Sequence, residues 1–282
     1  MAKGELKTRL VFGPLMLLIV GGVYWIDSTT ATRGFLTAGI LGLIGLGGVY
    51  EFVTMLRGSG HAVASTMLLL FTGALCASAL WFTGWQQLDR ELYPLAIGTL
   101  LLLFPISVRS LASDRMKRGL EEQGATLLGF VWIAWPMFLA QGMAVRHLPS
   151  VLFVILVCKG GDIGAYFVGS AIGRHKLIPH VSGGKTIEGA VGSLVASCAL
   201  AVGLSKWLMP ATAEVGLTGA VAIGIMLNVS AQVGDLVESL LKRNCGVKDS
   251  SRLLPAHGGV LDLIDSLLFA FPAYFAVLVR LT

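Results

Sequence analysis

Long apolar segments recur along the whole chain, and each is long enough to cross a lipid bilayer as a helix. A transmembrane helix needs about 20 predominantly apolar residues to cross roughly 30 Å of hydrocarbon. Segments of this kind cover residues 10–26, 34–56, 62–82, 92–111, 125–143, 149–173, 186–208, 215–241 and 260–279. The sequence therefore predicts an all-α, multi-pass integral membrane protein with about nine transmembrane helices.

The composition excludes several other classes of protein. Only 13% of the residues are charged, whereas a soluble domain has about 25%. The hydrophobic fraction of 55% is too large for a disordered chain. The four cysteines form no Cys-x-x-Cys pair, which argues against a zinc site or a disulfide framework. The net charge of +5 reports the loops of a membrane protein, and no nucleic-acid partner is expected.

The distribution of Lys and Arg predicts the orientation. With the N-terminus in the cytoplasm, cytoplasmic segments hold about three times as many of these residues as outer segments, as the positive-inside rule requires. An odd number of spans then places the C-terminus outside. Two cytoplasmic loops, 174–185 and 242–259, are long and basic. We expect a protein of the cell's inner (cytoplasmic) membrane whose active site faces the cytoplasm.

Charged residues divide the chain into two regions. The N-terminal membrane region, 1–124, has about four spans and a basic cytoplasmic linker, and its chief intramembrane charge is Glu51. The region 125–282 holds nearly all the other polar residues inside spans: Lys159, Asp162, Glu188, Asn228, Gln232, Asp235, Glu238, Asp262 and Asp265. Such residues are costly in lipid and mark functional sites by default. The second region is therefore predicted to be catalytic.

One face of the segment 215–241 is polar. Gln232, Asp235 and Ser239 are spaced so that a helix places them on the same side. No cation lies four residues after Asp235, which favours a functional role for this carboxylate. Glu238 precedes Lys242 by one helical turn, so these two side chains either form an ion pair at the helix end or take part in chemistry.

The loop 242–259 carries cations and a glycine pair ahead of two carboxylates. Asp262 and Asp265 lie one turn apart at the start of the last span. Carboxylates from two helices beside a basic loop suit Mg²⁺, which takes one or two carboxylates and completes its shell with water and phosphates. One or two such ions assist displacement at phosphorus. The pattern predicts phosphoryl or nucleotidyl transfer.

The segment 159–189 offers a second group of charges. Lys159 and Asp162 either neutralise one another or act in catalysis. The Gly-Gly-Lys-Thr sequence that contains Lys185 is not a P-loop, because Pro179 occupies the position of the first glycine and no strand is expected before it. Lys185 at a helix start can still bind phosphate oxygens.

These motifs resemble the phosphatidate cytidylyltransferase (CDP-diacylglycerol synthase) family. The segment 239–265 is similar to the family's signature of Ser, Lys-Arg, Lys-Asp, Pro-x-His-Gly-Gly and Asp-x-x-Asp. Supporting matches lie in 232–239, 162–169 and 184–189. Leu263 stands where the family usually has Arg, and Ile187 stands where it usually has Trp.

The resemblance implies that CTP and phosphatidate react to give CDP-diacylglycerol and pyrophosphate. It implies Mg²⁺ ligands at Asp235 and Asp262, with Asp265 secondary, and catalytic roles for Lys248 and His257. The remaining residues that the resemblance assigns to substrate binding are Asp162, Lys185, Glu188, Ser239, Lys242, Arg243, Gly258 and Gly259.

Two alternatives remain. A CTP-dependent lipid kinase of the polyprenol type would release CDP instead of pyrophosphate. A secondary transporter also uses charges near the membrane centre, but the charges here gather toward one face and no repeat relates the two halves. The expected partners are CTP, the lipid substrate and the bilayer, and a homodimer is compatible with this reading.

Overall fold

The computed structural model describes residues 18–30, 32, 34–81, 92–111, 116–209, 215–253 and 258–281. The chain forms two compact units. The first comprises Met1–Leu148 with Cys245–Ile264, and the second comprises Pro149–Asn244 with Asp265–Thr282. The division into the regions 1–124 and 125–282 stays a prediction.

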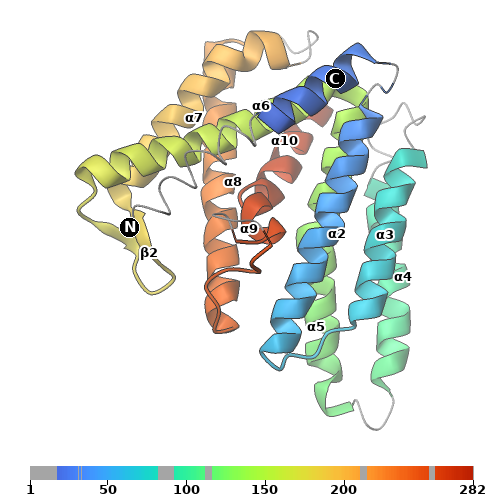
Figure 1. Cartoon of the computed structure of the whole chain (residues 1–282). Helices are drawn as coiled ribbons and strands as arrows, with labels where there is room; N and C mark the ends of the chain where they lie inside the picture. Colours follow the sequence, from blue (N-terminus) through green and yellow to red (C-terminus); the bar gives the residue numbers. More distant parts are fainter. Residues whose placement is uncertain are drawn as a thin grey trace. The chain divides into compact units, whose positions relative to one another are not determined.

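The first unit is a bundle of apolar helices (Figure 1). A helical segment covers 18–29, and it is followed by α2 (Phe35–Gly58), α3 (Ser65–Trp81), α4 (Leu92–Ser110), the short 3-10 helix η3 (Met116–Arg118), α5 (Gly119–Gly129), the π-helical turn η4 (Phe130–Ala134), the start of α6 (Trp135–Ile172) and α9 (Val260–Ile264). Glycines on α2 allow close packing, since a Cβ at Gly45 would lie 2.9 Å from the Met137 side chain. Phe52 of α2 packs edge-on against Trp132.

Helix α6 is bent near its middle. His147 has non-helical backbone angles (φ −146°, ψ 78°), and Pro149 follows inside the same helix. Proline removes a backbone donor and clashes with the preceding turn, which explains the kink. The predicted spans 125–143 and 149–173 thus lie in one helical stretch, Gly119–Ile172.

The second unit contains the rest of α6, the strands β1 (Lys176–Ile178) and β2 (Ser182–Thr186), and the helices α7 (Ile187–Leu208), α8 (Leu217–Asn244) and α10 (Leu267–Leu281). Helices α7 and α8 lie side by side (Figure 1). Asn228 of α8 donates from Nδ2 to the hydroxyls of Ser193 and Ser197 on α7, at 2.7 and 3.0 Å. Polar side chains of this kind hold membrane helices together.

The two strands are the one departure from an all-helical fold among the described residues. They form an antiparallel hairpin in which Lys176 pairs with Thr186 and Ile178 pairs with Ser182. The sequence predicts only a loop over 174–185. The strands were missed because each is too short to show an alternating pattern.

Five helical stretches of the described residues are long and apolar enough to cross a membrane. They are Phe35–Gly58, Gly119–Ile172, Ile187–Leu208, Leu217–Asn244 and Val260–Arg280, and the shorter apolar helices Ser65–Leu80 and Pro94–Ser110 cover two more predicted spans. Residues 10–17 of the predicted span 10–26 lie outside the described residues, and a helix covers the rest, 18–26. The chain is a multi-pass, predominantly helical membrane protein, whereas the number nine and the sides of the termini stay predictions.

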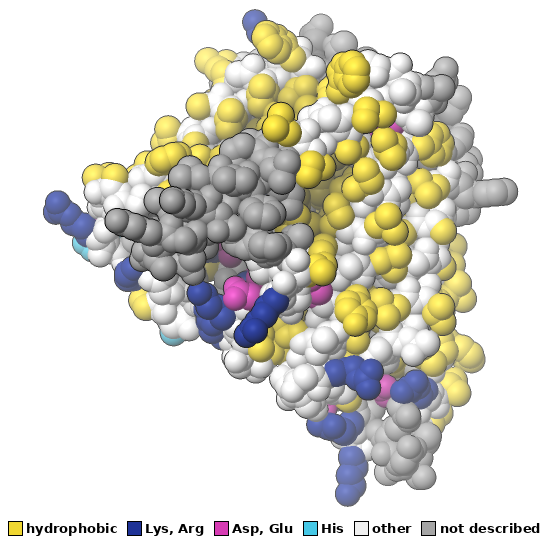
Figure 2. Space-filling model, in the orientation of Figure 1, with side chains coloured by type: hydrophobic (Ala, Val, Ile, Leu, Met, Phe, Trp, Pro, Cys, Tyr) yellow, Lys and Arg dark blue, Asp and Glu magenta, His cyan; other side chains and the backbone are white. Residues whose placement is uncertain are grey.

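The surface of the first unit separates apolar from cationic side chains. Exposed apolar residues such as Leu43, Leu70 and Leu100 lie along its helices. Arg57 lies in the last turn of α2, and Lys117 and Arg118 precede α5, so cations gather at one end of the bundle. Figure 2 shows dark-blue side chains at the lower end of the view and hydrophobic ones above them. This pattern fits helices that span lipid.

Candidate active site

A cluster of charged side chains lies within the second unit. We call it the Lys–Asp cluster, and it comprises Lys159, Asp162, Lys185, Asp235, Asp265 and Ser266. Its members come from α6, from β2, from α8 and from the two residues just before α10. Four segments far apart in the sequence therefore bring together most of the intramembrane charges of this unit.

Lys159 holds one half of the cluster. Its ammonium group donates to the Ser266 hydroxyl at 2.8 Å and lies 3.4 Å from Asp162 and 3.8 Å from Asp265. The predicted pairing of Lys159 with Asp162 is present, and Asp265 is an additional partner. Since one lysine faces two carboxylates, it cannot neutralise both.

Lys185 and Asp235 form the other half. The Lys185 ammonium lies 2.7 Å from Asp235 Oδ2, and the Ser239 hydroxyl donates to Oδ1 at 3.4 Å. Lys185 owes its position to the end of β2, which runs directly into α7. There the Thr186 hydroxyl caps the helix by accepting from Gly189 N at 3.1 Å. Gln232, Asp235 and Ser239 lie on one face of the continuous helix α8, as predicted, and Gln232 donates to Asn228 one turn earlier on that face.

A break in the helical structure places Asp265 and Ser266. Helix α9 ends at Ile264 and α10 begins at Leu267, and the Ser266 N–H donates to the side chain of Asp265 itself. Gly234 of α8 lies against the Asp265 carbonyl oxygen so closely that a Cβ would collide with it. Interrupted helices expose backbone groups and often line substrate sites in membranes.

The Lys–Asp cluster has more carboxylates than lysines, so its charge favours binding of a cation. Three carboxylates interact electrostatically with one another, and among the described residues two lysines, Lys159 and Lys185, form ion pairs with them. Among the described residues, no three His, Cys, Asp or Glu side chains are arranged to enclose a metal by themselves. Mg²⁺ needs only one or two carboxylates when phosphates and water complete its shell, so the donor set fits that ion bound together with a phosphate substrate.

The predicted substrate residue Glu188 has several partners inside its own unit. Its carboxylate accepts from the backbone N–H groups of Arg174 and His175, at 3.1 to 3.3 Å. His175 Nδ1 also lies 2.6 Å from Glu188 Oε1. Glu188 thus holds the start of the hairpin against α7, and its substrate role stays a prediction.

Asp262 belongs to the first unit, at the start of α9. Its Oδ2 atom accepts from Ser250 N at 2.8 Å, from the Ser250 hydroxyl at 2.7 Å and from Gly259 N at 2.8 Å. Gly258 has a positive φ of 87°, and a Cβ there would lie 2.6 Å from Asp262 Oδ2, so the glycine pair is required for this turn. Asp235 and Asp262 lie in different units, so their joint role as metal ligands stays a prediction.

The other predicted residues are distributed around these groups. Lys242 forms the ion pair with Glu238 that the spacing allowed. Arg243 donates from Nε to the Val181 carbonyl at the tip of the hairpin, at 3.3 Å. Lys248 is exposed in the loop of the first unit. His257 lies outside the described residues.

Several residues that the structure places at these sites have no role predicted from the sequence. The Ser266 hydroxyl accepts a hydrogen bond from Lys159, and the Ser250 hydroxyl donates one to Asp262. Glu51 accepts hydrogen bonds from the same loop as Asp262. Serines in a loop carry no pattern, whereas a lone Glu inside an apolar helix was a signal that could have been followed.

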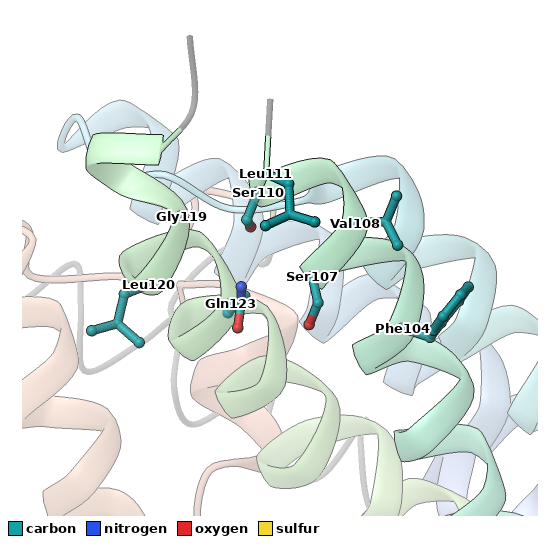
Figure 3. Close-up of a pocket in the computed structure, with 8 residues that line it drawn as sticks. All are labelled: Phe104, Ser107, Val108, Ser110, Leu111, Gly119, Leu120 and Gln123. Carbon is teal, nitrogen blue, oxygen red and sulfur yellow. The ribbon is translucent and has the colours of Figure 1, made fainter. Parts of the chain in front are cut away.

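A groove between α4 and α5 in the first unit is separate from these groups (Figure 3). Its lining is mostly apolar, and it includes Phe104, Ser107, Val108, Leu111, Leu120 and Gln123. None of the predicted site residues lines it, and it offers no titratable side chain for chemistry.

Comparison with known proteins identifies related sequences. The model of the cytidylyltransferase family matches residues 7–281. A phosphatidate cytidylyltransferase of Staphylococcus saprophyticus is 34% identical over 206 residues, which cover 66% of this chain and 78% of that protein. A phosphatidate cytidylyltransferase of Bacillus subtilis is 40% identical over 163 residues, covering 56% of this chain and 59% of that protein. The uncharacterized protein YnbB of Escherichia coli is 40% identical over 150 residues, covering 53% of this chain and 49% of that protein.

Proposed function

We propose that this chain, which belongs to the cytidylyltransferase family, transfers the cytidylyl group of CTP to phosphatidate and releases pyrophosphate. The family and the names of its relatives make the chain an enzyme, a nucleotidyltransferase. Phosphatidate as the substrate is carried over from the names of the Staphylococcus saprophyticus and Bacillus subtilis proteins. The lipid product is CDP-diacylglycerol.

The contact between Lys185 and Asp235 is the observation that best supports this chemistry. Lys185, which is predicted to bind phosphate, and Asp235, which is predicted to bind the metal, lie 2.7 Å apart, and both side chains are partly exposed. A nucleotide phosphate and its Mg²⁺ need these two kinds of group side by side. Neither a plain structural ion pair nor a transport site accounts for the family motifs around both residues.

In the reaction, an oxygen of the lipid phosphate attacks the α-phosphorus of CTP. A new P–O bond forms, the bond between the α-phosphorus and the bridging oxygen breaks, and its electron pair leaves with pyrophosphate. The attacking phosphate is already an anion near neutral pH, so no side chain has to remove a proton. Bound Mg²⁺ would neutralise charge that develops on the phosphates.

The side chains divide this work. Asp235 and Asp262 would hold the metal, with Asp265 as a further carboxylate. Lys185, Lys242, Arg243 and Lys248 would contact the phosphates, since cations placed where negative charge develops lower the barrier. The remaining predicted substrate contacts are Asp162, Glu188, Ser239, His257, Gly258 and Gly259. By the positive-inside rule, the basic loops support a location of this chemistry at the cytoplasmic face of the inner membrane.

Purified protein in detergent provides the test. Pyrophosphate release from CTP should require both phosphatidate and Mg²⁺, and ATP should not replace CTP. Asp235→Asn should lower turnover about 100-fold or more, because it removes a charged metal ligand. Asp27→Asn is the matched control, because Asp27 lies in the first unit near the N-terminus of α2, where it accepts hydrogen bonds from Gly34 and Thr37. Release of CDP instead of pyrophosphate would establish a kinase, and near-normal turnover of the Asp235 variant would refute its metal role.

A further inference from the structure

The first unit contains a buried carboxylate whose partners all come from the loop and helix that carry Asp262. Glu51 lies in α2, and 4% of its surface is exposed. It accepts from the hydroxyls of Ser250 and Ser251, at 2.9 and 2.7 Å, and from the backbone N–H groups of Val260 and Leu261, both at 2.9 Å. These partners are about 200 residues away in the sequence.

Glu51 supplies hydrogen-bond acceptors for the first N–H groups of α9. Val260 and Leu261 are the first residues of that helix, and N–H groups in a first turn have no acceptor within the helix. A carboxylate there also interacts favourably with the positive end of the helix dipole. Hydrogen bonds to an ionised acceptor are roughly twice as strong as those between neutral groups. Glu51 thus caps α9 from another helix.

The glycines of this region fit the same arrangement. A Cβ at Gly259 would collide with both the Ser250 hydroxyl and Glu51 Oε2. A Cβ at Gly48, one turn before Glu51 on α2, would lie 3.1 Å from Ile264 of α9. Absence of side chains at these positions lets the loop and α9 lie directly on α2.

One hydroxyl connects Glu51 to the predicted metal ligand. Ser250 Oγ lies 2.9 Å from Glu51 Oε2 and 2.7 Å from Asp262 Oδ2. The Ser250 N–H also donates to Asp262. Any displacement of the loop from Glu51 therefore moves the groups that orient the Asp262 carboxylate.

We propose that Glu51 is a positioning residue, which holds Ser250, Ser251 and the start of α9 on α2 and thereby sets the place of Asp262 and Lys248 for the reaction. This inference rests on the proposed function. It gives the N-terminal half a part in catalysis without any contact to substrate. The effect of Glu51 is expected on kcat, since misplacement of a catalytic group by about 1 Å costs on the order of 100-fold in rate.

The test compares Glu51→Gln with Gln141→Ala in the full-length protein. Gln141 is buried in the same unit, and it donates to the carbonyls of Ala38 and Cys76, at 2.9 and 3.3 Å, rather than to the residues that contact Glu51. Glu51→Gln should lower kcat about 100-fold with KM for CTP little changed. Gln141→Ala should lower Tm but leave kcat unchanged. Glu51→Asp keeps the charge and should recover part of the lost rate.

A second readout follows the loop without any activity. Cys245 is buried at the start of the loop segment, and a chain with Cys76, Cys158 and Cys198 replaced by Ala leaves it as the single thiol. Glu51→Gln should raise its rate of labelling by a water-soluble maleimide about tenfold, because local opening becomes easier. Unchanged labelling would overturn the positioning role. Faster labelling of the variant, together with no CDP-diacylglycerol formed by the protein that keeps Glu51, would support the anchor and refute the proposed function.

Discussion

The ammonium group of Lys159 on α6 lies 2.8 Å from the hydroxyl of Ser266, a residue 107 positions later in the chain. This contact joins the charged face of α6 to the break that precedes α10. Both residues lie in the second unit, and Asp162 and Asp265 flank the same ammonium group. Lys159 thus connects three other members of the Lys–Asp cluster: Asp162, Asp265 and Ser266.

Lys159→Met should impair both folding and turnover. The substitution keeps a long side chain but leaves three interacting carboxylates with Lys185 as the remaining lysine of the cluster. Removing one partner of a largely buried ion pair destabilises by a few kcal/mol, and partial exposure of these groups reduces this to about 2 kcal/mol. The free energy of unfolding, followed by thermal or denaturant titration in detergent, measures the loss.

Ser266→Ala is the control for the Lys159 variant. It removes the hydrogen bond but keeps the charge, so the expected loss is about 1 kcal/mol. Adding Asp265→Asn to Lys159→Met should recover part of the stability, because it removes one of the unbalanced carboxylates. Equal stability of wild type and Lys159→Met would show that the cluster does not depend on this cation.

The sequence predicted much of the helical structure because hydrophobicity over about 20 residues is a strong signal. Helices occupy the predicted segments 34–56, 186–208 and 215–241. The stretch 144–148 was predicted as a loop, but it is part of the bent α6. Its residues interrupt the apolar run, yet a kinked helix can continue through such a sequence.

The candidate site was predictable only in part. The approach of Asp235 and Ser239 follows from helical spacing, which is a local property. The ion pair between Asp235 and Lys185 depends on how the hairpin leads into α7, and no spacing rule connects residues 50 positions apart. The separation in sequence between Glu51 and its partner Ser251 is larger still, at 200 positions. Contacts of this kind arise from packing between segments, which a single sequence does not encode in a readable pattern.

Gly234→Ala should disturb the packing of α8 on the residues before α10. A Cβ at this position would collide with the Asp265 carbonyl oxygen, which is backbone and cannot swing aside. Overpacking of this type costs about 1 to 3 kcal/mol, and the shift should also reduce cytidylyl transfer. Tm and the rate of pyrophosphate release are the measurements.

Gly203→Ala on α7 is the matched control for Gly234→Ala. Among the described residues, no atom outside the neighbouring helix backbone lies within 4 Å of a Cβ at Gly203, so the new methyl group meets no side chain there. Alanine is favoured over glycine inside a helix by about 0.5 to 1 kcal/mol, and this variant should be as stable as wild type or slightly more stable. If the two alanine variants behaved alike, the close approach at Gly234 would be wrong.

Asp27 should make the stability of the first unit depend on pH. Burial alone raises the pKa of its carboxyl group, but hydrogen bonds from the Thr32 and Thr37 side chains and from the Thr37 and Gly34 N–H groups outweigh burial. The pKa is therefore lowered from its ordinary value of 3.8. A lowered pKa in the folded state means that the carboxylate stabilises the protein fully above pH 3.8, and that this contribution is lost as the pH falls through the folded pKa.

Asp27→Asn should lower the free energy of unfolding by about 1 kcal/mol near neutral pH, as loss of a helix cap does. The difference in Tm between wild type and variant should shrink as the pH falls below 3.8, and a difference that stayed constant down to pH 2 would show that the ionised form of Asp27 contributes nothing.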